Sequence, residues 1–427
     1  MKILLISTYD ISGGASIAAF RLHDALIQSG IDSQMLVDIK KSDFPSVLTV
    51  DSYDFEKKIG NIKRILRKII NKSLVLKYKR TKSKKYASFT PQKANNHKLV
   101  KKINEINPDI VHLHWICRDF LSVEDIAEIK APIVWSLHDM WAFTGGCHVV
   151  GEKFSDEKIN CDEYVRNCGN CEILGSKQYK DLSFYTLQRK KKTFAKVKKM
   201  TIIGLSRWMA DCASKSAVFA DKKIVNIPNP LDTETFQPLS KEQCRDFWKL
   251  PQDKKLVLFG AVSPISRAYK GYDLLMETLN KVKTKDIECV VFGANEPQNP
   301  PKIPFKVTYL GNVNDKQNLV KLYSACDITI SPSRRDNLSN VIMESLSCAT
   351  PVACFDIGGN SDMVDQRKNG FLAQAFDTSD LANGIDWILN NDSYEELQKN
   401  AREKVVKKFD SKVIASKYLE IYKDILK

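Results

Sequence analysis

Residues 327–346 have the sequence Asp-Ile-Thr-Ile-Ser-Pro-Ser-Arg-Arg-Asp-Asn-Leu-Ser-Asn-Val-Ile-Met-Glu-Ser-Leu. The β-branched run Ile328–Ile330 predicts a buried strand, Ser331 and Pro332 end it, and the apolar spacing from Val341 onward predicts a helix. Backbone N–H groups at a helix N-terminus lie at the positive end of the helix dipole, where phosphate is favoured. The stretch therefore predicts a strand, a loop and an anion-binding helix start, with an ordinary surface helix as the alternative.

Polar residues surround this expected anion site. Ser339 or Asn340 is the expected helix cap, and Asp336 and Glu344 are carboxylates nearby. On a helical wheel the core face is centred near Ile342, so Glu344 lies well off it and points into whatever cleft the loop borders. The expected anion site therefore has two carboxylates beside it.

The chain is long enough for two domains and has the composition of a globular protein. Its 427 residues exceed a single hydrophobic core, and 43% of them are hydrophobic and 27% charged. The apolar start Met1–Ser7 is too short for a signal peptide, and no apolar run approaches a membrane span. We therefore expect a cytoplasmic protein whose 11 cysteines are reduced.

The net charge of +15 is concentrated in residues 57–85, which contain 13 Lys or Arg and no Asp or Glu. Apolar residues recur there at helical spacing, at Ile59, Ile62, Leu66, Ile69 and Ile70. Such a basic amphipathic helix suits an anionic membrane surface, which would place the protein peripherally on the inner face of the membrane. A charged outer face on a packed helix is an equal alternative. Nucleic-acid binding is disfavoured because no aromatic residues interleave to stack bases.

The first half of the chain predicts an α/β domain. Its first strand is followed by Gly13 and Gly14 and then by a helical pattern. Two further strands end in polar residues that include His114 and His138. Because ligands bind outside the carboxyl ends of parallel strands, these histidines should share a crevice with the glycines. A histidine there would hydrogen-bond a sugar hydroxyl or a phosphate, and a structural core histidine is the alternative.

Four cysteines follow within 25 residues, namely Cys147, Cys161, Cys168 and Cys171. The last two have the Cys-x2-Cys spacing of a metal knuckle, and reduced thiols in this number suit tetrahedral Zn²⁺. Because no apolar element is evident between them, a structural zinc ion would order this loop. Free or redox-active thiols are the alternative, and His148 is a substitute ligand.

The second half predicts another doubly wound parallel sheet. It begins with a strand at 254–260, after which strands and helical patterns alternate. Arg267 and Lys270 follow this first strand, at a position that suits phosphate. The expected organisation is an N-terminal domain at 1–228, a linker at 229–253, a C-terminal domain at 254–408 and a final helix at 409–427.

Several motifs occur together along the chain: Tyr9–Gly14, His138-Asp139, Ile227–Asp232, Lys270-Gly-Tyr-Asp-Leu-Leu, Tyr309-Leu-Gly-Asn, residues 327–344 and Asp356-Ile-Gly-Gly. As a set they resemble the retaining glycosyltransferases of family 4, and the likeness extends over essentially the whole chain. The resemblance implies the GT-B fold, an α/β architecture of two Rossmann-like domains with an interdomain cleft. It also implies that the N-terminal domain binds an acceptor, that the C-terminal domain binds a nucleotide sugar, and that the final helix packs back on the N-terminal domain.

The activity implied by this resemblance is transfer of a sugar from a nucleotide-diphosphate sugar, with retention of anomeric configuration. The implied acceptor is a glycan or lipid-linked glycan in surface polysaccharide synthesis. The implied catalytic residues are His138, Asp336 and Lys270. The implied donor-binding residues are Gly13, Gly14, Arg267, Lys270, Asn337, Leu338, Ser339, Asn340 and Glu344.

This chain departs from the family at two positions. Asp336 stands where the family has a Glu, and Ala261 replaces an arginine, for which Arg267 or Arg334 is the candidate substitute. No Asp-x-Asp occurs, so we expect catalysis without a metal or other cofactor, and a structural zinc is the one metal expected. A non-catalytic module that binds a sugar nucleotide or a membrane surface is the alternative function.

Overall fold

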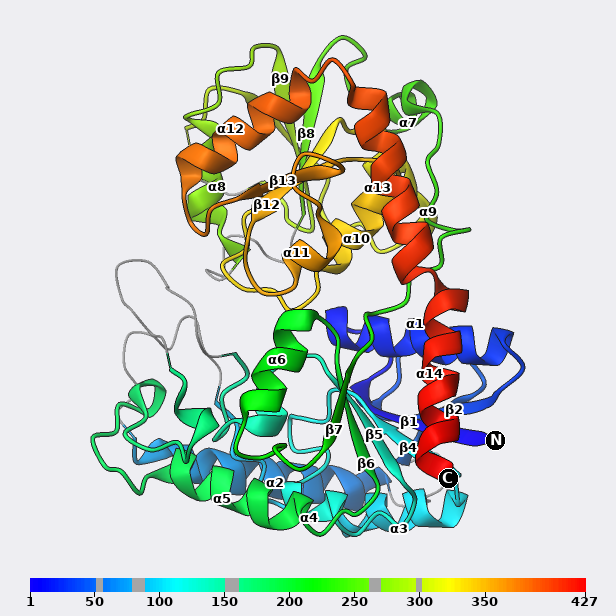
Figure 1. Cartoon of the computed structure of the whole chain (residues 1–427), viewed down its shortest axis with the longest axis vertical. Helices are drawn as coiled ribbons and strands as arrows, with labels where there is room; N and C mark the ends of the chain where they lie inside the picture. The colour runs from blue at the N-terminus through cyan, green and yellow to red at the C-terminus, as the bar shows by residue number, and fades with distance from the viewer. Residues whose placement is uncertain (51–56, 79–88, 150–160, 261–269, 297–301) are drawn as a thin grey trace. The chain divides into compact units, whose positions relative to one another are not determined.

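The computed structural model describes residues 1–50, 57–78, 89–149, 161–260, 270–296 and 302–427, and for 57–64 the backbone alone. The chain divides into two compact units. Unit 1 comprises Met1–Pro230 and Ile414–Lys427, and unit 2 comprises Leu231–Val413. Each unit has its own parallel sheet (Figure 1). Each also has its own hydrophobic cores.

Unit 1 contains a seven-stranded parallel sheet in the order β3-β2-β1-β4-β5-β6-β7. Its strands are β1 (Lys2–Tyr9), β2 (Asp32–Ile39), β3 (Val47–Thr49), β4 (Ile110–Leu113), β5 (Ile133–Leu137), β6 (Met200–Gly204) and β7 (Lys223–Asn226). The central strands β1, β4 and β5 are buried almost throughout, because helices cover both faces of a parallel sheet.

Alternate residues of β1 enter two different cores and so identify the two faces of this sheet. Leu4 and Ile6 pack with α3 (His97–Ile106), α4 (Val123–Ile126) and α5 (Leu182–Phe194). Ile3 and Leu5 pack with α1 (Gly14–Gln28) and with α14 (Ser411–Leu426), which from Ile414 onward belongs to unit 1. The remaining elements of unit 1 are α2 (Lys57–Leu76), α6 (Arg207–Lys215) and the 3-10 turns η3 (Trp141–Phe143), η4 (Glu163–Val165) and η5 (Glu172–Leu174).

Unit 2 contains a six-stranded parallel sheet in the order β10-β9-β8-β11-β12-β13. The strands are β8 (Lys255–Gly260), β9 (Ile287–Phe292), β10 (Lys306–Tyr309), β11 (Ile328–Ser331), β12 (Val352–Phe355) and β13 (Gly370–Ala373). One core holds residues of α9 (Lys316–Ala325), α10 (Asn340–Ser347) and α13 (Tyr394–Phe409), and the other holds residues of α8 (Tyr272–Leu279) and α12 (Thr378–Leu389). The unit also contains α7 (Lys241–Trp248), in the segment predicted as a linker, and α11 (Asn360–Met363).

The predicted α/β class with two doubly wound parallel sheets is confirmed, as is the strand, loop and helix of residues 327–346. In each sheet the direction of strand addition reverses once. The reversal lies between β1 and β4 in unit 1 and between β8 and β11 in unit 2. Ligands of open α/β sheets bind in the crevice outside the carboxyl ends of strands at such a switch point. The loops after these four strands are therefore where a ligand site is expected.

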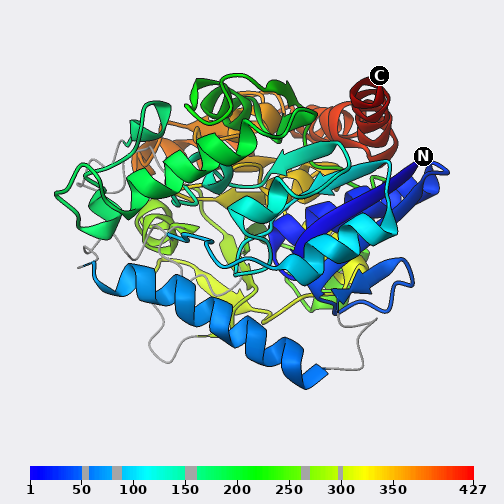
Figure 2. The same cartoon turned by 90° about the horizontal axis from the view of Figure 1, so that it is seen from below.

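Helix α2 forms over the predicted amphipathic segment, and Figure 2 shows it along the outer edge of unit 1. In the parts of the chain that the structure describes, no helix combines the length and the apolar content needed to cross a bilayer.

Candidate active site

The unit 2 switch point is built from the loop after β11 and the start of α8. Lys270 and Gly271 lie immediately before α8, and the loop after Ser331 carries the polar residues that lead into α10. Lys270 Nζ lies 3.1 Å from Asp336 Oδ2, and both side chains are partly buried. The structure thus joins two of the predicted catalytic residues as an ion pair at the carboxyl edge of the sheet.

Two glycines fix the backbone of this loop. Gly271 and Gly358 have φ angles of 70° and 51°, the left-handed region that favours glycine. A Cβ atom on Gly271 would lie 1.8 Å from the Pro332 carbonyl oxygen, and one on Gly358 would lie 1.9 Å from that of Asp336. The loop can approach the two turns only because neither glycine has a side chain, with Pro332 against Gly271 and Asp336 against Gly358.

Helix α10 begins where the sequence predicts. Ser339 is its N-cap residue, and its carbonyl accepts the Met343 N–H at 3.1 Å. The side chain of Ser339 makes no capping hydrogen bond. Leu338 and Ser339 are buried, while Asn337 and Asn340 are half-buried. The Ser339 hydroxyl is therefore not the group that pairs with the first N–H groups of α10.

Glu344 is buried in the structure, whereas the helical wheel placed it well off the core face of α10. Its side chain is only 6% exposed, and its Oε2 accepts a hydrogen bond of 2.9 Å from the Tyr323 hydroxyl of α9. Burial follows because α10 packs against α9, which the helical wheel of one segment does not contain. Glu344 is therefore a positioned carboxylate with a fixed neutral donor.

Arg334, a candidate for the missing arginine, is committed to a neighbouring helix. Its two terminal nitrogens donate to the two oxygens of Asp273 on α8, each at 2.6 Å. Burial raises the pKa of Asp273, but the hydrogen bonds and charge of Arg334 outweigh this and lower the pKa. Arg334 therefore holds the loop onto α8. The other candidate, Arg267, lies outside the described residues.

The unit 1 switch point contains the predicted glycines. Gly13 is the N-cap residue of α1 with a φ of 87°, and Gly14 is the first residue of that helix. A Cβ atom added to Gly13 would meet nothing within 4 Å, so this turn is open. Nearby, Asp10 accepts the backbone N–H groups of Lys41 and Ser42 at 2.9 and 2.7 Å. Asp10 thus ties the loop after β1 to the loop after β2.

His114 and His138 meet at this edge of the sheet, since Nδ1 of His114 lies 3.0 Å from Nε2 of His138. Beneath them, His112 Nδ1 hydrogen-bonds the Tyr422 hydroxyl at 2.6 Å and its Nε2 the Ser136 hydroxyl at 2.8 Å. Burial lowers the pKa of His112 to about 3 and that of His138 to about 4, and burial also lowers the pKa of His114 well below its ordinary value. All three rings are therefore neutral near pH 7 and act as hydrogen-bonding groups.

Asp139 anchors the loop that follows His138. Its Oδ2 accepts hydrogen bonds from Trp115 Nε1 and His148 Nδ1, each at 2.7 Å, and its Oδ1 accepts the Trp141 N–H at 2.9 Å. The second ring nitrogen of His148 bonds the Thr90 hydroxyl at 2.9 Å. His148, considered above as a substitute zinc ligand, is therefore used in this network.

Several partners in these networks carry no signal in the sequence. Tyr422 follows only a helical apolar pattern, although it is the buried partner of His112. Asp273 precedes its partner Arg334 by 61 positions, and nothing in either motif points to the other. In the sequence, only the adjacency of His138 and Asp139 indicates that these two residues belong to one loop.

The second unit matches a family of known proteins. Residues 240–404 match the family model "Glycosyl transferases group 1". An uncharacterized glycosyltransferase of Methanocaldococcus jannaschii is 23% identical over 329 residues, covering 74% of this chain and 75% of that protein. A Campylobacter jejuni N,N'-diacetylbacillosaminyl-diphospho-undecaprenol alpha-1,3-N-acetylgalactosaminyltransferase is 28% identical over 189 residues, covering 42% of this chain and 48% of that protein. This chain thus spans about half the length of the second relative.

Solved structures resemble the chain over its whole length. Sucrose-phosphate synthase from Thermosynechococcus elongatus has a TM-score of 0.65 at 17% identity, covering 99% of this chain and 98% of that chain. HepE from Anabaena in complex with UDP and glucose has a TM-score of 0.62 at 15% identity, covering 99% of both chains. The chain has the GT-B fold. The family match and the relatives support a glycosyltransferase and do not favour a non-catalytic binding module.

Proposed function

We propose that this GT-B chain is a retaining glycosyltransferase that moves a sugar from a nucleotide-diphosphate sugar to a glycan or lipid-linked glycan in surface polysaccharide synthesis. The observation that carries the proposal is the Lys270–Asp336 ion pair in the loop that leads into α10, within the region that matches group 1 glycosyltransferases. The similar fold of Anabaena HepE, whose solved structure is a complex with UDP and glucose, supports the choice of donor class.

The leaving group requires positive charge at this loop. When the sugar–phosphate bond breaks, the nucleoside diphosphate gains negative charge and the sugar becomes oxocarbenium-like. The ammonium of Lys270 and the N–H groups at the start of α10 stabilise that charge. We assign the diphosphate to these groups and assign no metal to it.

Asp336 has two roles in this proposal. In the free protein its ion pair with Lys270 keeps the Lys270 ammonium beside the loop that leads into α10. When the diphosphate binds, Lys270 contacts phosphate, and the Asp336 carboxylate accepts hydrogen bonds from hydroxyls of the donor sugar. Because Asp is one methylene shorter than Glu, its reach to the sugar depends on the close packing of its loop against Gly271 and Gly358.

Glu344 and His138 complete the assignments. The Glu344 carboxylate, positioned by Tyr323, accepts hydrogen bonds from the ribose hydroxyls. His138, neutral because burial lowers its pKa to about 4, is assigned as a hydrogen-bonding partner of a sugar hydroxyl. In the transfer itself the sugar–phosphate bond breaks, the acceptor oxygen bonds to the anomeric carbon on the same face, and the acceptor proton passes to the leaving phosphate.

Helix α2 supports an acceptor at a membrane surface. Ile65, Leu66, Ile69, Ile70 and Leu76 are 55%, 52%, 57%, 47% and 70% exposed. Lys68 and Lys72 are exposed on the same helix. Apolar side chains flanked by lysines insert at the boundary of an anionic bilayer.

The opposite side of α2 is attached to unit 1. Arg67 Nε donates to the Asp119 carbonyl at 2.9 Å, and the Asn71 amide donates to the Asp119 carboxylate. The Asn71 carbonyl oxygen accepts the Lys93 N–H at 2.7 Å. The apolar side chains are thus held outward on a fixed helix, which suits a peripheral position on the membrane and a lipid-linked acceptor.

The test is incubation of the purified full chain with a panel of nucleotide-diphosphate sugars and lipid-linked or free glycan acceptors. We expect release of nucleoside diphosphate from at least one donor, and a product whose anomeric configuration by NMR equals that of the donor. An inverted product would refute retention. Tight donor binding without turnover on any acceptor would instead favour a binding module.

A further inference from the structure

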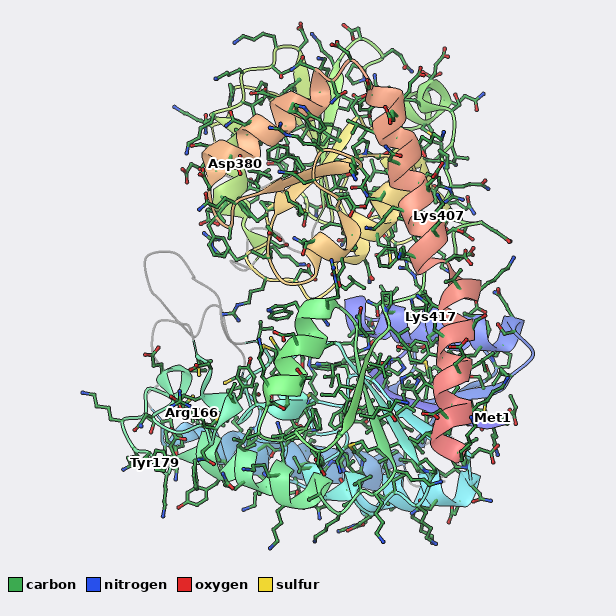
Figure 3. The ribbon with its side chains drawn as sticks, in the orientation of Figure 1. Met1, Arg166, Tyr179, Asp380, Lys407 and Lys417 are labelled. Atoms are coloured by element: carbon green, nitrogen blue, oxygen red, sulfur yellow. The ribbon has the colours of Figure 1, made fainter. Side chains whose placement is uncertain are left out.

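The four clustered cysteines of unit 1 belong to short segments that meet beside α5. Cys147 follows η3, Cys161 precedes η4, and Cys168 and Cys171 lie between η4 and η5. Cys147 and Cys168 are buried, Cys161 and Cys171 are half-buried, and all four are free thiols. In Figure 3 the labelled Arg166 and Tyr179 mark this region at the edge of unit 1.

Each of these thiols interacts with the other three. Cys147 and Cys171 share a hydrogen bond between their side chains, and every other pair is close enough for electrostatic interaction. No three of these described sulfur atoms all lie within 4.8 Å of one another. A tetrahedral zinc site with Zn–S bonds of about 2.3 Å would bring them to about 3.8 Å apart. Metal binding therefore requires the segments that carry the four cysteines to move closer together, while their arrangement relative to one another stays the same.

Backbone N–H groups already point at three of the sulfurs. The Glu163 N–H donates to Cys161, the Gly145 N–H donates to Cys168, and the N–H groups of Ile173 and Leu174 donate to Cys171. Two of these sulfurs stand just before a 3-10 turn whose N–H groups they accept. These N–H groups orient the sulfurs of Cys161, Cys168 and Cys171 within their short segments.

The Cys168–Cys171 turn is held in a strained conformation. Cys168 and Asn170 have φ angles of 51° and 45°, and a Cβ atom on Gly169 would lie 2.1 Å from the Tyr179 carbonyl oxygen. The Cys171 N–H donates to Asp181, the N-cap residue of α5, at 2.8 Å. Left-handed conformations are unfavourable for non-glycine residues and persist where the surroundings fix them.

A buried lysine lies next to the thiols. Lys190 of α5 is fully buried, donates to the carbonyls of Trp141 and Thr144, and interacts electrostatically with Cys168. Lys190 also holds the loop between His138 and Cys147, because both of these carbonyls belong to that loop.

We propose that Cys147, Cys161, Cys168 and Cys171 bind one structural Zn²⁺ that fixes the loop after β5. The loop that Cys147 ends also carries Asp139, and the next residue, His148, bonds Asp139. Zinc would therefore fix the end of the loop that carries His138 and Asp139, while β5 fixes the start of the same loop.

The experiment measures metal content of the full chain purified without chelators, and again after treatment with Zn²⁺ or Co²⁺ under reducing conditions. We expect about one equivalent of zinc per chain and, with Co²⁺, the absorption of a tetrahedral thiolate site. Cys161→Ala and Cys171→Ala, which alter half-buried thiols, should each lose the metal. Cys212→Ala, at a buried thiol of α6, should retain it and is the matched control.

Three results would overturn the proposal. One is less than about half an equivalent of metal in folded wild-type protein after reconstitution. Another is full retention of metal in both cluster variants. A third is a Cys147–Cys171 disulfide found by alkylation and mass spectrometry in protein isolated under reducing conditions. If the alanine variants do not fold, the wild-type metal content and the Co²⁺ spectrum still decide the question.

Discussion

The Nζ atom of Lys270 lies 3.1 Å from Oδ2 of Asp336, although 66 positions separate the two residues in the sequence. The pair joins the start of α8 to the loop before α10, at the switch point of the unit 2 sheet. A cation and an anion held together at a ligand-binding edge are suited to exchange partners when a phosphorylated sugar binds. The first two predictions follow from this relationship.

Replacing Lys270 with glutamine should weaken donor binding and slow transfer, because the diphosphate loses its charge-assisted donor. The expected loss in kcat/KM is about 10²–10³-fold. The matched control is Lys281→Gln, since Lys281 also pairs with a carboxylate, Glu277 at 2.7 Å, but on the exposed end of α8. Equal losses in both variants would show that the effect is structural.

Variants of Asp336 distinguish the effect of its side-chain charge from the effect of its side-chain length. Asp336→Asn keeps the size of the side chain but removes its charge, and we expect a loss of about 10²-fold in kcat. Asp336→Glu restores the carboxylate with the longer arm and should retain measurable transfer. If Asp336→Asn turns over as fast as the wild type, the carboxylate has no part in the reaction.

Glu344→Gln should raise the dissociation constant for the donor by about tenfold to a hundredfold, because a hydrogen bond to a charged group contributes about 1.5–3 kcal/mol. Tyr323→Phe removes only the donor that positions Glu344 and should weaken binding less. Calorimetric titration with the nucleotide sugar measures both. Unchanged affinity in Glu344→Gln would refute the assignment to the ribose.

The buried histidines predict a loss of stability in mild acid. Burial lowers the pKa of His138 from 6.5 to about 4, so the unfolded chain binds a proton in this range that the folded chain does not. The stabilising contribution is complete above pH 6.5 and falls by about 1.4 kcal/mol per pH unit as the pH decreases toward 4. Urea denaturation at about pH 7.5 and about pH 5 should show that the free energy of unfolding falls by about 2 kcal/mol more in the wild type than in His138→Gln.

The control for this measurement is His97→Gln, at an exposed histidine of α3. It should leave the pH dependence of stability unchanged. A His138→Gln protein with the wild-type pH dependence would mean that His138 titrates normally in the folded state.

Helix α2 predicts binding to anionic vesicles. Leu66→Glu with Ile69→Glu should abolish sedimentation with vesicles that contain phosphatidylglycerol, because both side chains are more than half exposed. Val406→Glu changes a 38% exposed apolar residue of α13 and should bind as the wild type does. Binding that survives the double substitution would place the membrane contact elsewhere.

Local sequence patterns were sufficient to predict the fold class and the strands and helix that position the site. The strand at Ile328–Ile330, a helix start at Ser339 or Asn340 and the strand ends at His114 and His138 were all predicted from apolar periodicity and the polar residues that interrupt it. Such patterns reflect the burial of one segment at a time. The order of strands and the position of the switch points then determine which loops lie together.

The sequence could not show which polar groups pair across the fold. The Arg334–Asp273 pair, the burial of Glu344 against Tyr323 and the Tyr422–His112 hydrogen bond each join separate elements. Each depends on how helices pack against one another, which no single segment encodes. Lys190 is the clearest case, because a lysine on a charged helix is normally exposed, and here it is fully buried beside Trp141.

The most direct test of the central claim is calorimetric titration of wild type and Lys270→Gln with a panel of nucleotide-diphosphate sugars. The account predicts that at least one donor binds the wild type, and that its affinity falls at least about tenfold in the variant. Failure of every donor to bind, or equal affinity in the two proteins, would contradict it.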